Sequence, residues 1–185
     1  GIPESAHFKK RWNQSGTKPH GATFAFVQYR IQKKERIGVK APITTCGIYL
    51  YSTASEKILV CHATHSPWNN WSIPKGLQDE GEELYEAATR ELYEETGVEL
   101  KQVSVLAIHS LEARKYKKQN KVLESFLVVT DSDLSIHSFV CHSMTEKKFP
   151  EVDKWKWISL DEAEKQLHEA QQVNIAGIKE LLSNL

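Results

Sequence analysis

The residues that most constrain this chain are glutamates on the apolar side of a predicted helix. Residues 82–96 have the apolar spacing of an amphipathic helix, and Gly97 follows as a typical helix-ending glycine. With about 100° of rotation per residue, Glu91 and Glu95 fall within the apolar stripe, and Glu94 flanks it. Unpaired buried carboxylates are costly, and several together repel one another. The helix therefore needs raised carboxyl pKa values or a bound cation.

The alternative is a solvated Glu-rich helix face, which is the common explanation of an isolated Glu-x-x-Glu-Glu pattern. Three features favour a cation site instead. The carboxylates lie on the buried side, Arg90 adjoins them and can balance their charge, and the loop at residues 73–76 is suited to holding phosphate oxygens. Hard divalent cations prefer carboxylate oxygen. The sequence therefore predicts a Mg²⁺ or Mn²⁺ site.

Residues 76–98 carry a signature that resembles that of the Nudix hydrolases. It consists of a glycine, five residues, a glutamate, seven residues, Arg-Glu, an aliphatic residue, one residue, Glu-Glu, one residue, a glycine and an aliphatic residue. All nine fixed positions match, namely Gly76, Glu82, Arg90, Glu91, Leu92, Glu94, Glu95, Gly97 and Val98. The resemblance covers roughly residues 40–185. It implies an α/β (α+β) fold, namely an α/β/α sandwich with a mixed central sheet. It also implies an enzyme that cleaves a pyrophosphate bond in a nucleotide-like small molecule.

The resemblance also implies roles for the matching residues. Glu91, Glu94 and Glu95 are the expected metal ligands. The backbone carbonyl of Gly76 is expected to join them, because glycine lets the backbone approach closely. One of these glutamates, or another on a loop, activates the attacking water.

Two further positions complete the predicted catalytic set. Arg90 is expected to pair with Glu82 and to hold the catalytic loop against the helix. A catalytic glutamate outside the signature is common in the family, at a varying position. Glu151, which precedes a Trp-x-Trp strand, is the first candidate, and Glu124 is the second. The alternative for each is an exposed carboxylate without a role.

The substrate side is predicted from residues around the signature. Lys75 is a candidate phosphate contact, with a solvated loop lysine as the alternative. The Trp71-Ser-Ile-Pro-Lys-Gly run is similar to that of the branch with diadenosine tetraphosphate and diphosphoinositol polyphosphate hydrolases. Tyr116 and Lys117 lie in the basic stretch 114–118, which together with Lys121 binds further phosphates or is a solvated loop. Trp68, Trp71, Tyr116 and Trp155 are candidates for stacking on a base, although such aromatics are more often core or rim residues.

The remaining patterns predict one mixed domain after an N-terminal extension. Residues 1–40 are expected to form a partly flexible extension with a strand at 23–31, and residues 41–185 the hydrolase domain. Strands are expected at 44–51, 57–62, 102–110, 121–130 and 154–158. An irregular segment or hairpin is expected at 131–150, and amphipathic helices at 160–170 and 173–182.

Composition narrows the classes of partner. Lys plus Arg equals Asp plus Glu at 24 each, and this zero net charge makes a nucleic-acid-coating role unlikely, since such domains are usually basic. The three cysteines, Cys46, Cys61 and Cys141, lack Cys-x-x-Cys spacing, which favours reduced thiols in a cytoplasmic protein over a zinc site. No apolar run approaches the ~20 residues of a membrane helix. The expected partner is a small nucleotide-like substrate, with no membrane.

Three functions follow from these patterns. The first is a pyrophosphohydrolase, in which water attacks phosphorus while metal ions stabilise charge. The second is a non-catalytic Nudix domain that senses a nucleotide. The third is an isomerase or other metal enzyme, which needs further acids and cysteines of known placement. Sensing domains usually lose carboxylates of the signature, and all of them are kept here, so the sequence favours the hydrolase.

Overall fold

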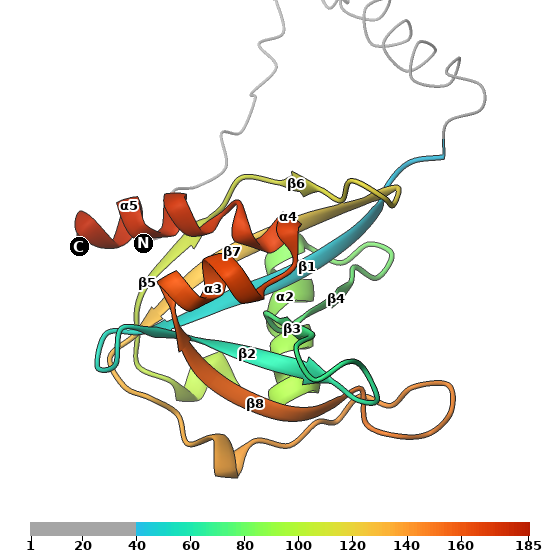
Figure 1. The fold of residues 1–185 in the computed structure, drawn as a ribbon, viewed down its shortest axis with the longest axis horizontal. Helices are drawn as coiled ribbons and strands as arrows, with labels where there is room; N and C mark the ends of the chain where they lie inside the picture. Colours follow the sequence, from blue (N-terminus) through green and yellow to red (C-terminus); the bar gives the residue numbers. More distant parts are fainter. Residues whose placement is uncertain (1–39) are drawn as a thin grey trace, which may run out of the picture. The chain divides into compact units, whose positions relative to one another are not determined.

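A mixed sheet with helices on both faces is the frame of this protein (Figure 1). The computed structural model describes residues 40–185. The sheet is built from β1 (Ile43–Ser52), β2 (Lys57–Ala63), β3 (Trp71–Ser72), β4 (Lys75–Leu77), β5 (Val105–Ser110), β6 (Arg114–Lys115), β7 (Lys121–Thr130) and β8 (Val152–Ser159). Its main path runs β3–β2–β1–β7–β5, while β4 pairs with β1, β6 with β7 and β8 with β2. Strands β1 and β7 are parallel, and the other pairs are antiparallel.

The helices divide the core into two layers, one on each side of the sheet (Figure 1). Helix α2 (Leu84–Thr96) packs on one face, and α3 (Leu160–Gln166), α4 (Glu169–Gln172) and α5 (Ile175–Ser183) pack on the other. Successive residues of β1 point to opposite layers, so Ile48 lies in the α2 layer and Tyr49 in the α5 layer. A strand buried on both faces has a nearly continuous apolar sequence, as β1 has. The predicted α/β/α sandwich is confirmed.

Most predicted elements are confirmed, and the main difference lies near the C-terminus. The helix expected at 160–170 ends at Gln166. His168 starts a new helix there, because its Nδ1 accepts the backbone N–H of Ala170 at 3.3 Å and caps α4. The strand expected at 102–110 begins at Val105, because a 3₁₀ turn, η1 (Leu100–Gln102), precedes it. Residues 131–150 are irregular apart from η2 (Ile136–Ser138) and an isolated bridge.

Helix α2 ends at Thr96 as its sequence predicts and begins at Leu84, two residues later than expected. Glu83 caps its first turn, and Gly97 ends it in the left-handed conformation with φ 75°. The predicted N-terminal extension and its strand at 23–31 lie outside the described residues, apart from Lys40. In residues 40–185, no helix combines the length and the apolar character needed to cross a membrane.

Candidate active site

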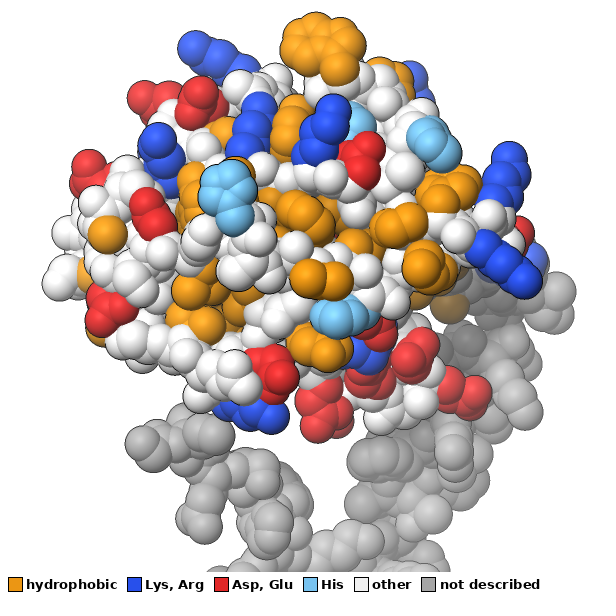
Figure 2. Space-filling view, turned by 90° about the horizontal axis from the view of Figure 1, so that it is seen from below, with side chains coloured by type: hydrophobic (Ala, Val, Ile, Leu, Met, Phe, Trp, Pro, Cys, Tyr) orange, Lys and Arg blue, Asp and Glu red, His pale blue; other side chains and the backbone are white. Residues whose placement is uncertain are grey.

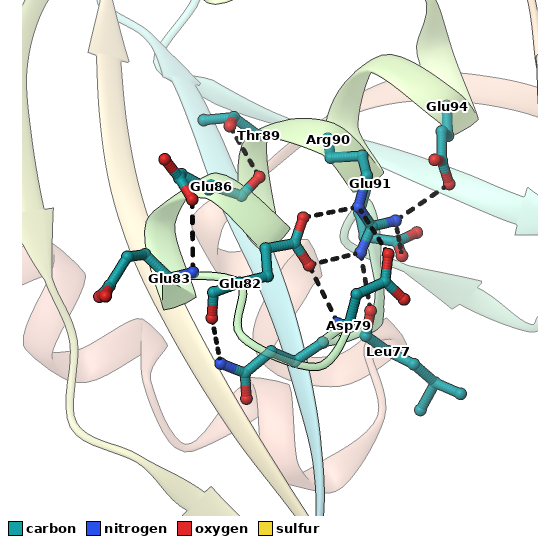
Figure 3. Close-up of polar contacts among 10 residues, drawn as sticks. Leu77, Asp79, Glu82, Glu83, Glu86, Thr89, Arg90, Glu91 and Glu94 are labelled. Atoms are coloured by element: carbon teal, nitrogen blue, oxygen red, sulfur yellow. Dashed lines mark hydrogen bonds and ion pairs between the residues drawn. The ribbon is translucent and has the colours of Figure 1, made fainter.

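Arg90 joins the signature loop to helix α2 (Figure 3). Its Nε donates to Glu82 Oε1 at 2.8 Å, and its Nη2 donates to the carbonyl oxygen of Leu77 at 2.8 Å. Its Nη1 donates to Glu91 Oε1 at 2.7 Å and to Glu94 Oε2 at 3.2 Å. The bond from Arg90 holds the pKa of Glu82 below its ordinary value. One guanidinium thus connects the loop after β4 with two of the three predicted metal ligands.

Gly76 lies directly against the carboxylate of Glu91. Glu91 is buried, with 6% of its surface exposed. A Cβ built on Gly76 would overlap the carboxylate carbon and both carboxylate oxygens of Glu91. Burial raises the pKa of Glu91, the charges of Glu94 and Glu151 add to the rise, and Arg90 opposes it. Only a glycine at this position leaves room for the carboxylate.

Glu95 is half-buried at the last turn of α2. Its Oε2 accepts the backbone N–H of Lys75 at 3.3 Å. Burial, aided by the charges of Glu91 and Glu151 and opposed by Lys75, raises the pKa of Glu95 to about 8. Because Glu91 and Glu95 are one helical turn apart, they lie on the same face of α2, and the charge of Glu91 acts on Glu95. Two like charges on one face favour a bound cation.

The two glutamates considered outside the signature lie in different surroundings. Glu151 is exposed immediately before β8, and its charge acts on Glu91 and Glu95. Glu124 lies on β7 beside Cys46 of β1, and its charge adds to the burial that raises the pKa of Cys46 to about 11. The backbone N–H of Glu151 donates to Ser143, whose own N–H donates to the carbonyl of Glu94, so Glu151 is linked to the end of α2 through one residue.

The donor set fits a hard divalent cation, although it does not form a finished cage. Among residues 40–185, no three His, Cys, Asp or Glu side chains are grouped so that they could hold a metal ion as they stand. Arg90 instead binds Glu91 and Glu94. The available donors are carboxylate oxygens, which Mg²⁺ and Mn²⁺ prefer. The raised pKa values show that the ionised forms of Glu91 and Glu95 are unfavourable here, and a bound cation would stabilise them.

Tyr116, Lys121 and His168 form a group on which the charge of Lys75 acts. The rings of Tyr116 and His168 are 4.9 Å apart, and Lys121 Nζ lies 5.4 Å from the Tyr116 ring centroid. Burial lowers the pKa of both His168 and Lys121, and the positive charge of Lys75 lowers both further. The hydroxyl of Tyr116 is buried without a hydrogen-bond partner within residues 40–185. An anion such as a phosphate group would relieve the repulsion between these nitrogens.

His168 is the residue of this group that the sequence does not indicate. It falls within the span 160–170, which the spacing predicts to be one helix, where a histidine gives no sign of a role. The break after Gln166 is what allows its ring to lie against Tyr116.

Trp71 and Lys117, both predicted to bind substrate, have other partners in the structure. Lys156 Nζ lies 4.2 Å from the centroid of the half-buried Trp71 ring. Lys117 is 77% exposed and forms an ion pair with Glu169. The structure therefore places Lys75 and Tyr116 in one neighbourhood and gives Trp71 and Lys117 contacts of their own.

Charge is mixed on the face of the protein that Figure 2 shows. Basic and acidic side chains are scattered among apolar ones, and several acidic side chains gather along its lower edge. This face has no broad basic field of the kind used to coat nucleic acid.

Comparisons with known proteins agree with this geometry. Residues 42–178 match the family model of the NUDIX domain. The RNA pyrophosphohydrolase of Dinoroseobacter shibae is 34% identical over 134 residues, which cover 63% of this chain and 77% of that protein. The RNA pyrophosphohydrolase of Actinobacillus succinogenes is 34% identical over 99 residues, which cover 49% of this chain and only 50% of that protein. A crystal structure of a C. elegans Ap4A hydrolase binary complex has a similar fold, with a TM-score of 0.59 and 22% identity over 76% of this chain and 99% of that one.

Proposed function

The chain belongs to the Nudix family of hydrolases, which act on phosphoanhydride bonds, and we propose that it cleaves a nucleoside diphosphate linked to another moiety. The first candidate substrate is a dinucleoside polyphosphate, and the reaction uses Mg²⁺ or Mn²⁺. One observation carries the proposal. The carboxylate of Glu91 lies against Gly76, that of Glu95 accepts the backbone N–H of the neighbouring Lys75, and the charge of Glu151 raises the pKa of both.

The cation is proposed to bind to Glu91, Glu94, Glu95 and the carbonyl of Gly76. When bound, it neutralises charge on the phosphate oxygens and lowers the pKa of water. Binding requires Glu91 and Glu94 to exchange part of their contact with Arg90 for the cation. Arg90 keeps its bonds to the loop, so it balances the charge and holds Gly76 in place.

The remaining residues orient the substrate and accept the proton. Glu151 is proposed as the proton acceptor for the attacking water, because it is exposed and its charge reaches the other carboxylates. Lys75 is proposed to bind a phosphate as a point charge. Tyr116 and Trp71 are proposed as further substrate contacts, and the exposed Lys117, which pairs with Glu169, as a peripheral contact that contributes little to binding.

The names of the bacterial relatives favour a second candidate substrate, the 5′ end of an RNA. The zero net charge and the mixed charge in Figure 2 favour a small molecule over an extended nucleic acid. We propose a cytoplasmic location, because Cys46, Cys61 and Cys141 are free thiols.

A substrate panel tests this function. The purified chain would be incubated with Mg²⁺ or Mn²⁺ and with dinucleoside polyphosphates, nucleoside diphosphate sugars, nucleoside triphosphates, diphosphoinositols and 5′-triphosphate RNA. Products would be separated by chromatography. Glu94→Gln is expected to lose turnover, whereas Glu86→Gln, on the exposed first turn of the same helix, is expected to keep it.

The outcomes separate the candidate functions. The best substrate in the panel distinguishes a dinucleoside polyphosphate from an RNA end. Nucleotide binding without turnover in the wild-type chain would favour a sensing domain. Turnover by Glu94→Gln at the wild-type rate would contradict the proposed carboxylate site.

A further inference from the structure

The last turn of α2 has backbone carbonyls that the helix cannot satisfy, because the helix ends at Gly97. The carbonyls of three consecutive residues accept hydrogen bonds from the segment 140–155. The bonds are from His142 N–H and Ser143 N–H to Glu94 at 2.6 and 3.1 Å, from Trp155 Nε1–H to Glu95 at 2.9 Å, and from Val140 N–H to Thr96 at 3.1 Å. Two of these three acceptors belong to proposed metal ligands.

Only one of these donors is a side chain. The backbone N–H groups of residues 140, 142 and 143 can be supplied by almost any amino acid. The bond to the Glu95 carbonyl depends on the indole of Trp155, which is half-buried in the α2 layer of the core. The identity of residue 155 therefore affects the backbone of Glu95 directly.

Trp155 and Cys61, which both lie near Glu95, are on the same face of the sheet. Trp155 on β8 is the register partner of Cys61 on β2, and paired residues point to the same face. The buried thiol of Cys61 interacts with the Glu95 carboxylate, which also accepts the N–H of Lys75. Glu95 is thus held at its carboxylate by the backbone N–H of Lys75, and at its carbonyl by Trp155.

We propose that Trp155 is a positioning residue whose indole N–H fixes the last turn of α2 and so aims the carboxylates of Glu94 and Glu95 at the cation. The inference rests on the proposed function. Without this donor, a half-buried carbonyl loses its partner and the last turn gains freedom. Cation binding must then order that turn as well, so the affinity falls. Groups that orient metal ligands typically change metal affinity by about 10–100-fold.

The chain offers a matched control in Trp157. It lies two residues further along β8, so it points to the same face, and it is also half-buried. Its Nε1 donates to the carbonyl of Leu134 at 3.0 Å, away from α2. A Trp→Phe change at either position removes one indole N–H and keeps an aromatic ring. The two variants should therefore lose similar stability, and only the change at Trp155 should alter the cation site.

The test is Mn²⁺ binding to the full, metal-free chain without substrate, measured by calorimetry, together with the Tm of each variant. Trp155→Phe is expected to bind Mn²⁺ about tenfold or more weakly than the wild type. Trp157→Phe is expected to stay within about twofold, with a similar loss in Tm. Trp155→His, which keeps a ring N–H, is expected to lose less affinity than Trp155→Phe.

Three results would overturn the inference. Wild-type affinity in Trp155→Phe would show that the indole does not position the ligands. Equal weakening in Trp157→Phe would assign the effect to general destabilisation, and an affinity of Trp155→His below that of Trp155→Phe would exclude the N–H as the cause. A wild-type chain that binds no Mn²⁺ would overturn the proposed function as well, whereas the first three results leave that function standing.

Discussion

The two helix layers on this sheet bury different kinds of side chain. In the α5 layer, Ile175 and Ile178 are fully buried, and the buried Tyr49 hydroxyl donates to the carbonyl of Gln171 at 2.8 Å. In the α2 layer, Leu92 is fully buried as well, but Glu91 is buried beside it with a raised pKa. In the α5 layer, the Tyr49 hydroxyl is satisfied internally. The α2 layer keeps carboxylates whose repulsion a ligand must relieve, which is the usual compromise of a site selected for chemistry.

Gly76→Ala is expected to have the largest effect on activity, because Gly76 lies directly against Glu91 of α2. The added Cβ would overlap the Glu91 carboxylate and displace it from the cation site. A displacement of about 1 Å in a catalytic site can lower the rate by about 100-fold. Steady-state kinetics with varied Mg²⁺ would measure a fall in kcat/KM of about that size or more. Activity within a few-fold of the wild type would contradict the placement of Gly76 in the site.

Much of the α2 layer could be predicted from the sequence, because its information is local. The helical spacing alone places Glu91 in the apolar stripe and Gly97 at the helix end, and both are confirmed. Its supports could not be predicted in this way. The bond from Trp155 to Glu95 joins residues 60 positions apart, and no local spacing indicates that β8 passes beside the end of α2.

The substrate side was harder to predict for a related reason. The residues that gather near Lys75 come from β7, from the loop after β6 and from the turn before α4. His168 enters this group only because the expected helix is interrupted, and the interruption depends on its own capping bond to Ala170. Periodicity predicts the apolar face of such a segment but does not locate a break of two residues, Leu167 and His168.

Lys75 and Lys117 are both predicted to bind substrate, and substitutions at the two positions are expected to differ in their effect on KM. Lys75→Met is expected to raise KM about tenfold with a smaller change in kcat, because its charge lies beside Glu95 where the phosphates must bind. Lys117→Met is the matched control and is expected to change KM less than about threefold, since exposed ion pairs contribute little. Kinetics on the best substrate of the panel would measure both. A larger effect on KM at Lys117 than at Lys75 would indicate that the substrate phosphates bind nearer to α4.

The pH dependence of stability is expected to come from the α2 layer. A carboxyl whose pKa rises from 4.5 to about 8 on folding binds its proton more tightly in the folded state. Its stabilising contribution is therefore complete below about pH 4.5 and is lost as the pH rises toward about 8. In the metal-free chain, the Tm of Glu95→Gln relative to the wild type should increase over this range. Calorimetry in a chelating buffer at several pH values would measure it, and Tm curves that stay parallel would contradict the raised pKa.

The smallest expected effect is a change in the α5 layer that alters the free energy of unfolding without altering activity. Gly177 is an exposed position within α5, and a Cβ built there meets nothing within 4 Å. Gly177→Ala should stabilise the chain by about 0.5–1 kcal/mol, because alanine loses less backbone entropy in a helix. Denaturant unfolding would measure the gain, and kcat/KM should not change. A Gly→Ala change would then lower kcat/KM by about 100-fold or more at position 76 and leave it unchanged at position 177. A loss of activity at Gly177 would show instead that the two layers are coupled through the sheet.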